Sequence, residues 1–522
     1  MHLALDVPFS PTRVLFPNES HLKAPNDQNI AEMKPFNSSL KRNRPQMEAI
    51  AAILAQRAGF PPFIIFGPTG TGKTVTIVEA ILQLIARDQN VRILACAQSN
   101  SAADLLAERL RRGLPVGPNK LFRLNAPFRS VEKYPPNLRA YTFIDKNGRF
   151  SIRSAKDLAK YNVVVSTCMT AGIPHGVGMK TGHFGYVFID DAGRAMEPET
   201  MVPIKTMGDP RTNIILSGDS LQLGPFIQSG VARIFGLNIS FLERLMERKI
   251  YKDKTRHGIT FVKLTKNFKN HDTILYFPNT HFYNSELQAC GDRKVIDRFI
   301  GSPVLPNRMF PIVFHGVSGE DDRESDSPSY FNIAEVSVVA EYVDRLFRDT
   351  SHPLDIEEIG VIAPYSAQSK KLREKLDRKY PNLKIGSVEE YQDEEPDVII
   401  LTTVRTDREL VANDLRHALG PLVNPRRLNE IITRPKGLLV IVGDPLILGL
   451  DPLWRKFLNY IHVNGGWTGC APDWNTTTAV NKDAKGLVTE RETRREADME
   501  NLTRRLMDVA IGEGVGALRY AL

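Results

Sequence analysis

The sequence predicts an α/β protein with two domains, each built on a parallel β-sheet that helices cover on both faces. Short apolar runs alternate with helical patterns along most of the chain, and near-continuous apolar runs are typical of strands buried on both faces. The runs fall into two series, and 522 residues are enough for two separate cores. The predicted strands are 63–66, 91–97, 162–168, 186–190 and 213–218 in the first series, and 311–316, 359–364, 398–404 and 438–443 in the second.

The gap between the two series places the join between the domains near residues 250–260. A basic, proline-containing segment interrupts the first series and predicts an insertion. The charged end of the chain is interpreted as a solvated helix or a disordered tail rather than a binding arm. The predicted parts are an N-terminal extension (1–40), a first domain (41–252, with the insertion at about 115–160), a second domain (253–470) and a C-terminal tail (471–522).

The composition argues against several classes of protein. No apolar run approaches the roughly 20 residues of a membrane span, and the N-terminus lacks the pattern of a secretory signal peptide. We therefore expect no membrane partner. A formal net charge of +8 favours polyanions such as nucleic acid, although only weakly. The four cysteines form no C-x-x-C pair, which indicates reduced thiols in cytosol or nucleus and argues against a zinc module; they are Cys96, Cys168, Cys290 and Cys470.

A phosphate-binding loop is the strongest motif. "GPTGTGKT" matches the pattern G-x-x-x-x-G-K-[ST], and it follows a predicted strand and precedes a predicted helix, as the motif requires. Its glycines allow backbone N–H groups to surround phosphates, and the helix N-terminus adds its dipole. Lys73 would reach the β/γ-phosphates and Thr74 would hold Mg²⁺. The predicted nucleotide-binding residues of this loop are Gly67, Gly70, Thr71, Gly72, Lys73 and Thr74.

Asp190 ends the predicted strand "YVFID", and a second carboxylate, Asp191, follows it directly. The carboxyl edge of a parallel sheet is where a nucleotide-hydrolysing enzyme would hold its metal and its base. The phosphate loop alone does not identify the process that hydrolysis drives, because kinases, transporters and GTPases share it.

The order of further motifs resembles that of a known family. After the phosphate loop come "ILACAQSNSAADLL", "VVVSTCMTAG", "FIDDAGRAMEPE", "LSGDSLQLGP", "LTKNFKN", "GVIAPYSAQ", "IGSVEEYQDEEPDVIILTTVR" and "NPRRLNEIITRPKGLLVIVGDP". This order resembles the superfamily 1B helicases of the nonsense-mediated-decay helicase group. Segments outside these motifs, among them "YNSELQACGD" and "NGGWTGC", resemble the Armitage branch of RNA-silencing helicases. The resemblance covers roughly residues 12–470.

The resemblance implies two RecA-like (P-loop NTPase) domains with ATP and Mg²⁺ in the cleft between them. It implies an ATP-dependent RNA helicase that moves 5′ to 3′ on single-stranded RNA, or on a duplex with a 5′ tail, in RNA silencing or decay. Silencing proteins would be partners, and the location would be cytoplasmic, with perinuclear sites or RNA granules as alternatives. Because only 45 residues precede Gln46, we expect a helicase core without the N-terminal domains of many relatives, either native or truncated.

The resemblance also assigns roles to individual residues. Those expected at ATP are Gln46 (adenine), Asp190 (Mg²⁺, with Thr74), Asp191 (the position of the catalytic Glu), Gln222 (γ-phosphate sensor), Phe268 (stacking on the base), Lys269 (the following Arg of the family), Glu395 (nucleotide contact) and Arg434 (arginine finger). Those expected to contact RNA are Ser99, Asn100, Thr167, Tyr365 and Ser387, for which capping of a strand end is an equal alternative. The basic "RLNAPFR" is interpreted as solvated surface rather than as additional phosphate contacts.

Several departures from the family pattern cluster at the predicted chemistry. Asp191 is one methylene shorter than Glu, which withdraws the carboxylate by about 1.5 Å. The other departures are Gln98 for Pro, Arg194 for Gln or His, Lys269 for Arg, Asp393 for Gly and Pro435 for Ala. Together they predict retained but slow ATP hydrolysis. An ATP-gated RNA clamp without unwinding and a DNA helicase of the same superfamily remain the alternatives.

Overall fold

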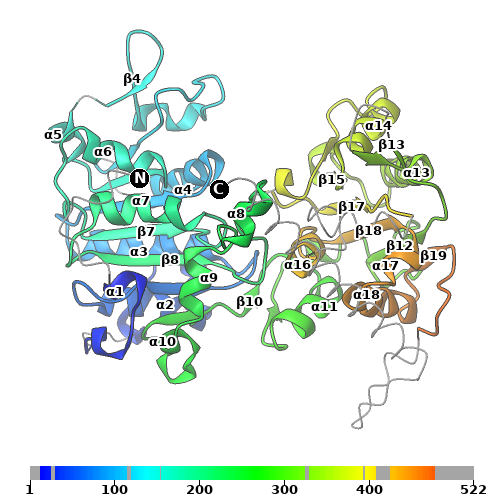
Figure 1. The fold of residues 1–522 in the computed structure, drawn as a ribbon, viewed down its shortest axis with the longest axis horizontal. Coiled ribbons are helices and arrows are strands. Elements are labelled where there is room, and N and C mark those ends of the chain that lie inside the picture. The colour runs from blue at the N-terminus through cyan, green and yellow to red at the C-terminus, as the bar shows by residue number, and fades with distance from the viewer. Residues whose placement is uncertain are drawn as a thin grey trace, which may run out of the picture. The chain divides into compact units, whose positions relative to one another are not determined.

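The computed structural model describes residues 12–24, 30–114, 119–152, 154–323, 329–391, 394–406 and 424–476. The chain divides into two units, Met1–Asn267 and Phe268–Leu522. Each unit has its own parallel sheet with helices packed against it, which confirms the predicted fold class (Figure 1).

The sheet of unit 1 has seven parallel strands in the order β3-β6-β2-β7-β8-β1-β9. All five of its central strands start and end within two residues of the predicted apolar runs, and β1, β7 and β8 coincide with them. The strands are β1 Phe63–Phe66, β2 Ile93–Ala97, β3 Leu121–Arg123, β6 Val163–Thr167, β7 Tyr186–Asp190, β8 Asn213–Gly218 and β9 Phe261–Lys263.

Alternation along these strands divides the core of unit 1 between the two faces of the sheet. Phe63 and Ile65 of β1 belong to the cluster that contains helices α2, α3 and α4. Ile64 and Phe66 belong to the cluster that contains α7, α9 and α10. The helices that supply these clusters are α2 Arg44–Ala55, α3 Lys73–Arg87, α4 Asn100–Gly113, α7 Glu197–Met207, α9 Phe241–Met246 and α10 Lys249–Lys252.

Helix α3 positions the phosphate loop. Its buried residues include Ile77, Ile81 and Leu84, whose spacing of three and four places them on one helical face. Gly72 precedes the helix with a left-handed backbone (φ 85°), and Asp88 ends it. The loop is therefore fixed between a buried strand, β1, and a helix that packs on the same sheet.

Two segments predicted to lie outside the first domain's sheet are part of unit 1. The predicted insertion supplies the edge strand β3, which pairs with β6. Residues of the predicted N-terminal extension also pack on the unit: Val14 is buried in the core, and Arg13 donates to the carbonyls of Phe60 (2.8 Å) and Thr212 (3.0 Å). A run of three residues on a sheet edge is too short to show as an apolar strand in the sequence.

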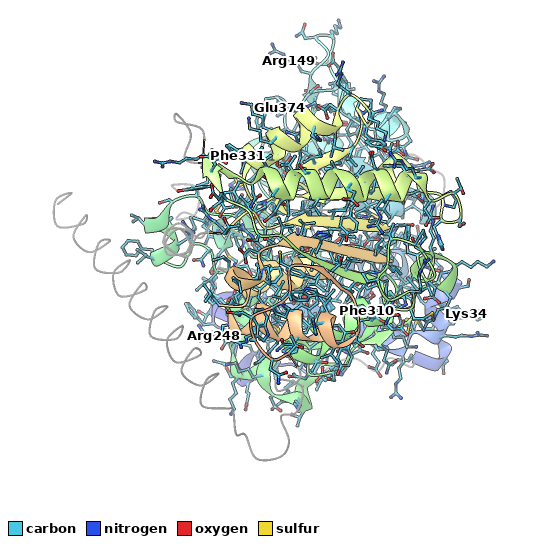
Figure 2. The ribbon with its side chains drawn as sticks, turned by 90° about the vertical axis from the view of Figure 1, so that its right-hand side faces the viewer. Lys34, Arg149, Arg248, Phe310, Phe331 and Glu374 are labelled. Atoms are coloured by element: carbon cyan, nitrogen blue, oxygen red, sulfur yellow. The ribbon has the colours of Figure 1, made fainter. Side chains whose placement is uncertain are left out.

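The sheet of unit 2 has six parallel strands in the order β16-β15-β17-β18-β12-β19. The strands are β12 Ile312–Gly316, β15 Ile359–Ile362, β16 Lys384–Gly386, β17 Val398–Thr402, β18 Leu438–Gly443 and β19 Trp467–Gly469. In Figure 2 the long helix α13 (Ile333–Arg348) lies along the strands, with Phe331 at its amino end. The other helices of eight or more residues described in this unit are α11 Asp272–Phe282, α14 Ser366–Leu376, α16 Pro425–Ile432 and α18 Pro452–Val463.

Shorter elements complete the described residues. The short helices are α1 Thr12–Leu15, α5 Ala155–Leu158, α6 Ile173–Gly176, α8 Gly230–Ile234, α12 Arg293–Ile296 and α17 Pro445–Leu448. The two-residue strands are β4 Phe143–Ile144, β5 Phe150–Ser151, β10 Lys266–Asn267, β11 Gln288–Ala289, β13 Asp322–Arg323 and β14 Tyr330–Phe331. The 3₁₀ turns are Glu19–His21, Ile30–Glu32, Ser38–Arg42, Pro136–Tyr141, Thr170–Gly172, Lys254–Arg256, Ile356–Glu358 and Glu389–Tyr391.

The division between the units falls after the predicted join. Strand β9 pairs with β1, so residues of the predicted second domain, from 253 to 267, belong to unit 1. Most of the predicted C-terminal tail (477–522) lies outside the described residues. No helix in the described ranges is long and apolar enough to cross a membrane.

Candidate functional site

The carboxyl edge of the unit 1 sheet gathers most of the predicted residues of that unit. Because all seven strands are parallel, the loops that follow them lie along one edge. The loops after β1, β7 and β8 are neighbours, and they carry the phosphate loop, the two aspartates and Gln222. The loops after β2 and β6 continue the same edge and carry Ser99, Asn100 and Thr167.

Two glycines give the phosphate loop its shape. Gly70 and Gly72 have φ of 86° and 85°, values that side chains with a Cβ rarely adopt. Gln46 packs against this loop, since its Nε2 donates to the Gly72 carbonyl (3.0 Å) and to Thr76 Oγ1 (2.9 Å). A Cβ at Gly72 would lie 2.6 Å from that nitrogen. Gln46, predicted to read adenine, is thus buried beside the loop and is fixed by it.

The predicted metal residues, Thr74 and Asp190, are brought together. Thr74 Oγ1 donates to Asp190 Oδ2 at 2.6 Å, and Ser217 donates to the other oxygen. Burial raises the pKa of the Asp190 carboxyl, and the hydrogen bonds from Ser217 and Thr74 oppose this rise by stabilising the anion. The Lys73 ammonium donates to the Gly67 carbonyl at 2.8 Å, within its own loop.

Gln222 also lies against the phosphate loop. Its Oε1 accepts from Thr69 N (3.2 Å) and Thr69 Oγ1 (3.0 Å), and Asn267 Nδ2 donates to the Thr69 carbonyl (3.1 Å). Sequence reasoning assigned Gln222 but not Thr69 or Asn267. The contacts of Gln222 connect the loop after β8 with the loop after β1.

Asp191 has a left-handed backbone conformation, and its carboxylate is paired with a cation. Its φ is 52°, which aspartate tolerates better than most residues. Its N–H donates to Asp190 Oδ1 and to Ser217 Oγ, both at 3.2 Å. Its carboxylate lies 2.9 Å from Arg194 Nε. Two of the departures noted in the sequence therefore form one ion pair.

The loops that carry Lys269 and Arg434 are joined within unit 2. Both side chains are buried. Asn270, the residue after Lys269, connects the two loops. Its Nδ2 donates to the carbonyls of Thr433 (2.9 Å) and Pro435 (2.6 Å), the residues on either side of Arg434. Helix α16 ends at Ile432, before Arg434, as the following proline predicts. Sequence reasoning did not single out Asn270.

Arg434 forms a buried ion pair with Glu430 in the same unit. Both side chains are almost completely buried; Glu430 lies in the last turn of α16, and Arg434 follows four residues later, just beyond the end of the helix. Arg434 Nη1 also donates to the Glu394 carbonyl at 3.2 Å. The carboxylate balances the charge of the predicted arginine finger. Glu430 was missed by sequence reasoning, although an acid within the apolar run "LNEII" was a signal for it.

The remaining nucleotide candidates of unit 2 are at the surface or outside the described residues. Phe268 is half-exposed and Glu395 is exposed. Asp393 lies outside the residues that the structure describes. Their predicted roles stay predictions.

The first group of predicted RNA contacts lies on the unit 1 edge. Ser99 caps α4, with its hydroxyl accepting from Ala102 N, and Thr167 Oγ1 bonds to Thr170 Oγ1 at 2.7 Å. Asn100 is exposed, and its Oδ1 accepts from Arg123 Nη2 at 3.2 Å. The expected solvated surface at "RLNAPFR" is wrong for its first three residues, which are buried; Arg123 is completely buried against Asp104 (2.8 Å). Burial lowers the pKa of the Arg123 guanidinium, and the Asp104 charge opposes that shift.

The second group lies in unit 2. Tyr365 is buried, and its hydroxyl accepts from Arg405 Nε at 3.0 Å. Arg405 Cζ also lies 3.6 Å from the centre of the Tyr330 ring, and Arg405 Nη1 lies 3.0 Å from Asp321 Oδ2. Ser387 N donates to Glu390 at 3.0 Å. The Tyr365 hydroxyl is thus part of an internal network, which sequence reasoning did not anticipate.

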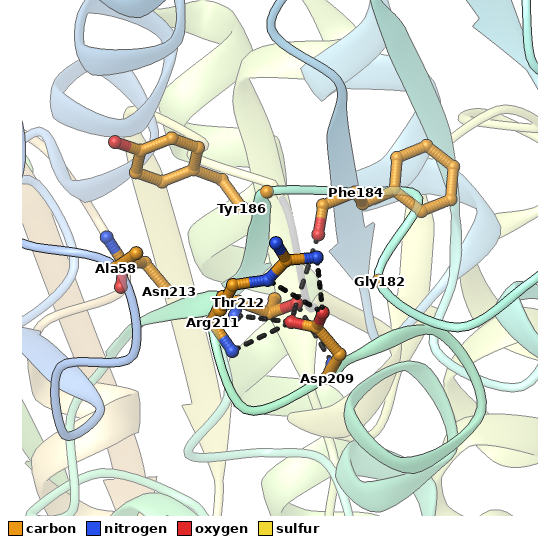
Figure 3. A pocket seen from close by; sticks show the side chains of 9 residues that line it. Ala58, Gly182, Phe184, Tyr186, Asp209, Arg211, Thr212 and Asn213 are labelled. Carbon is orange, nitrogen blue, oxygen red and sulfur yellow. Dashed lines mark hydrogen bonds and ion pairs between the residues drawn. The ribbon is translucent and has the colours of Figure 1, made fainter.

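A pocket at the opposite, amino edge of the unit 1 sheet contains none of the predicted residues (Figure 3). It lies where β7 and β8 begin, at Tyr186 and Asn213. Asp209 accepts from Arg211 Nη2 at 3.2 Å and from Thr212 N at 3.0 Å. The polar groups of this turn hydrogen-bond to one another, so their role in holding the turn accounts for them without a ligand.

The residues of the phosphate site fit a nucleoside triphosphate with Mg²⁺. The loop offers backbone N–H groups in a glycine-dependent conformation, one ammonium group from Lys73, and a hydroxyl–carboxylate pair from Thr74 and Asp190. A hydroxyl and a carboxylate are the ligands that Mg²⁺ takes beside phosphate oxygens.

Comparisons with known proteins show the family of this chain. Two family models, each described as an AAA domain, match residues 41–146 with 144–230 and residues 237–446. The chain is 40% identical to "RNA helicase Mov10l1" of Homo sapiens over 84% of its own length, 39% identical to "Putative helicase MOV-10" of Gallus gallus over 87%, and 33% identical to "Probable RNA helicase armi" of Drosophila melanogaster over 84%. It spans 36%, 50% and 40% of the lengths of these relatives. The chain belongs to the family of superfamily 1 helicases that contains Mov10l1, MOV-10 and Armitage.

Proposed function

We propose that this chain is the motor of an ATP-dependent RNA helicase that moves 5′ to 3′ along single-stranded RNA. The observation that carries the proposal is the meeting of Lys73, Thr74, Asp190 and Gln222 at one loop of unit 1. Relatives that are named RNA helicases support RNA as the substrate.

The proposed roles follow from charge. Thr74 and Asp190 would hold Mg²⁺, which would neutralise phosphate charge when bound. Lys73 would exchange its bond to the Gly67 carbonyl for phosphate oxygens. Asp191 would orient the attacking water, and Gln222 would respond to the γ-phosphate through Thr69. Lys269 and Arg434 are the cations that we assign to the charge developing during phosphoryl transfer.

Slow hydrolysis is part of the proposal. Asp191 is short for its role and is paired with Arg194 at 2.9 Å, while Arg434 is paired with Glu430. Each pairing must be broken or rearranged before the group can act on ATP, and that cost adds to the barrier. The same two ion pairs favour a second candidate function, an ATP-gated RNA clamp that binds without unwinding.

Strand displacement distinguishes the two functions. The substrates are one RNA duplex with a 5′ tail and the same duplex with a 3′ tail, each with ATP and Mg²⁺. The helicase proposal predicts displacement of the 5′-tailed duplex only, and none by Lys73→Ala. ATP-dependent binding of the tail without displacement would favour the clamp, and preference for the 3′ tail would contradict the proposed direction.

The substrate and the setting are proposed on the same basis. Competition between RNA and DNA strands of one sequence tests RNA against the DNA-helicase alternative, because only RNA offers a 2′-hydroxyl. A role in RNA silencing or decay, silencing proteins as partners, and a cytoplasmic location follow from the same family. Co-purification of RNA with the tagged chain from cytoplasmic extract, compared with Lys73→Ala, checks this setting.

A further inference from the structure

The carboxyl edge of the unit 1 sheet has two halves. The strand order places the loops after β7, β8 and β1, which hold the phosphate site, on one half. The loops after β2, β6 and β3 occupy the other half. The predicted RNA contacts Ser99, Asn100 and Thr167 lie on this second half, and the loop after β3 is next to them without an assigned role.

Buried charges hold the loop after β3 in place. Asp104 of α4 accepts from Arg123 Nε at 2.8 Å and from Arg129 Nη1 at 3.0 Å, so one carboxylate fixes both ends of the loop. Arg129 Nη1 also donates to Asn125 Oδ1 (2.7 Å), and its guanidinium lies 5.0 Å from the centre of the Tyr134 ring. Since these arginines serve the loop itself, they are committed to structure rather than to phosphates.

The anchored loop presents an aromatic side chain to solvent. The Arg129 N–H donates to the Ala126 carbonyl at 3.1 Å and closes a turn, and Phe128 within this turn is 92% exposed. On the neighbouring loop, directly after β6, Met169 is 61% exposed. That loop is fixed as well, because Thr170 N donates to Thr167 Oγ1 at 3.2 Å. Single exposed apolar residues are ordinary, but here two stand on loops that follow the neighbouring strands β3 and β6, on the same half of the edge as the predicted RNA contacts.

We propose that Phe128 and Met169 form a platform on which bases of single-stranded RNA stack, beside the backbone contacts of Ser99, Asn100 and Thr167. This proposal rests on the proposed function. Every base offers a flat π-face to an aromatic ring, so the contact tolerates any sequence, as a moving motor requires. The same network orients one backbone contact, because Arg123 also donates to Asn100 Oδ1 at 3.2 Å.

The test measures binding of a fluorescein-labelled single-stranded RNA in the presence of a non-hydrolysable ATP analogue. Phe128→Ala should weaken affinity about tenfold, equivalent to about 1.4 kcal/mol, while Phe128→Trp should retain it. Phe36→Ala is the matched control, because Phe36 is also exposed (54%) and lies outside this edge. Phe128 contributes nothing to the core, so its substitution leaves the fold intact.

Two further readouts separate stacking from charge. The slope of log affinity against log salt should be the same for wild type and Phe128→Ala, because no phosphate contact is removed. A 2-aminopurine base in the RNA should be quenched by wild type and less quenched by the alanine variant. A smaller slope for Phe128→Ala than for the wild type would show that this loop contacts phosphates, and it would overturn the platform. If the wild type binds RNA tightly and Phe128→Ala binds it equally well, the platform is overturned while the helicase proposal stays intact. Failure of wild type to bind any single strand would overturn both.

Discussion

Asp191 and Arg434, two of the residues assigned to hydrolysis, each lie against an opposite charge in their own unit. Asp191 is partly exposed and pairs with Arg194, whereas Arg434 and Glu430 are buried together. The Asp191–Arg194 pair is partly buried, with side-chain exposures of 31% and 11%, so solvent screens it more than it screens the fully buried pair of Arg434. The length of the Asp191 side chain should therefore limit the rate more than its pairing does.

Replacing Asp191 by Glu should raise the RNA-stimulated kcat. The longer side chain restores about 1.5 Å of reach, and a misplacement of about 1 Å can cost on the order of 10²-fold in rate. We expect a gain of about tenfold or more, with the KM for ATP changed less than kcat. Asp191→Asn is the control and should lower the rate. No gain from glutamate would show that the position of this carboxylate does not limit turnover.

Replacing Glu430 by Gln should also raise kcat, for a different reason. The amide keeps a hydrogen-bonding group beside Arg434 but removes the charge that neutralises it. We expect a gain of severalfold, visible in ATP turnover at saturating RNA. In an Arg434→Ala background the same change should have no effect, because its target is absent. A gain that persists without Arg434 would assign Glu430 another role.

At the scale of elements, Glu335 ties helix α13 to the end of strand β17. It is completely buried, and it accepts from Thr402 Oγ1, Thr403 N and Val404 N. Val404 has a φ of 73°, a strained value for a β-branched residue. Burial raises the pKa of the Glu335 carboxyl to about 7, despite these hydrogen bonds.

This raised pKa predicts a pH dependence of stability. Between about pH 4.5, the ordinary pKa of the group, and about pH 7, the folded chain holds a proton that the unfolded chain has released. The contribution of this bound proton to the free energy of unfolding is therefore complete below this pH window. It is lost as the pH rises through the window, by on the order of 3 kcal/mol. Hydrogen exchange in β17 at pH 5 and pH 7.5 measures the loss. Glu335→Gln should flatten the profile, and an equal profile in both proteins would contradict the assignment.

A structural role is predicted for Arg123 as well. Arg123→Met should destabilise unit 1 by about 3–5 kcal/mol, because it leaves Asp104 without one of its two buried partners. Thermal unfolding measures this loss. Lys133→Met, a change at an exposed residue of the same predicted insertion, is the control and should leave unfolding unchanged within about 0.5 kcal/mol.

The long central strands could be predicted because each is a continuous apolar run. Strands β1, β7, β8 and β18 begin and end where the sequence predicts. The three-residue strands β3, β9, β16 and β19 carry too few apolar residues to stand out from loops. Missing β9 placed the domain join too early, and missing β3 led to an insertion that is partly a sheet edge.

The site was predictable in its motifs and not in its contacts. The phosphate loop follows from its spacing, Asp190 from its place at a strand end and Gln222 from the family resemblance, and the structure brings them together. The ion pairs of Asp191 and Arg434 depend on where side chains point after the strand and helix end, which spacing does not specify. The anchoring of Arg123 on Asp104 depends on β3 joining the sheet, so it could not be foreseen once β3 was missed.

At the scale of the whole molecule, the chain has one unit that carries the phosphate loop and another that carries the assigned cations Lys269 and Arg434. The proposed function thus assigns roles in hydrolysis to residues of both units. The central claim is that this chain uses ATP in response to RNA, although slowly.

The most direct measurement is ATP turnover by the wild type and by Lys73→Ala, each with and without single-stranded RNA. The account predicts that RNA raises wild-type turnover severalfold above its RNA-free rate, while Lys73→Ala stays at background in both conditions. Wild-type rates indistinguishable from those of Lys73→Ala, with RNA present, would contradict it.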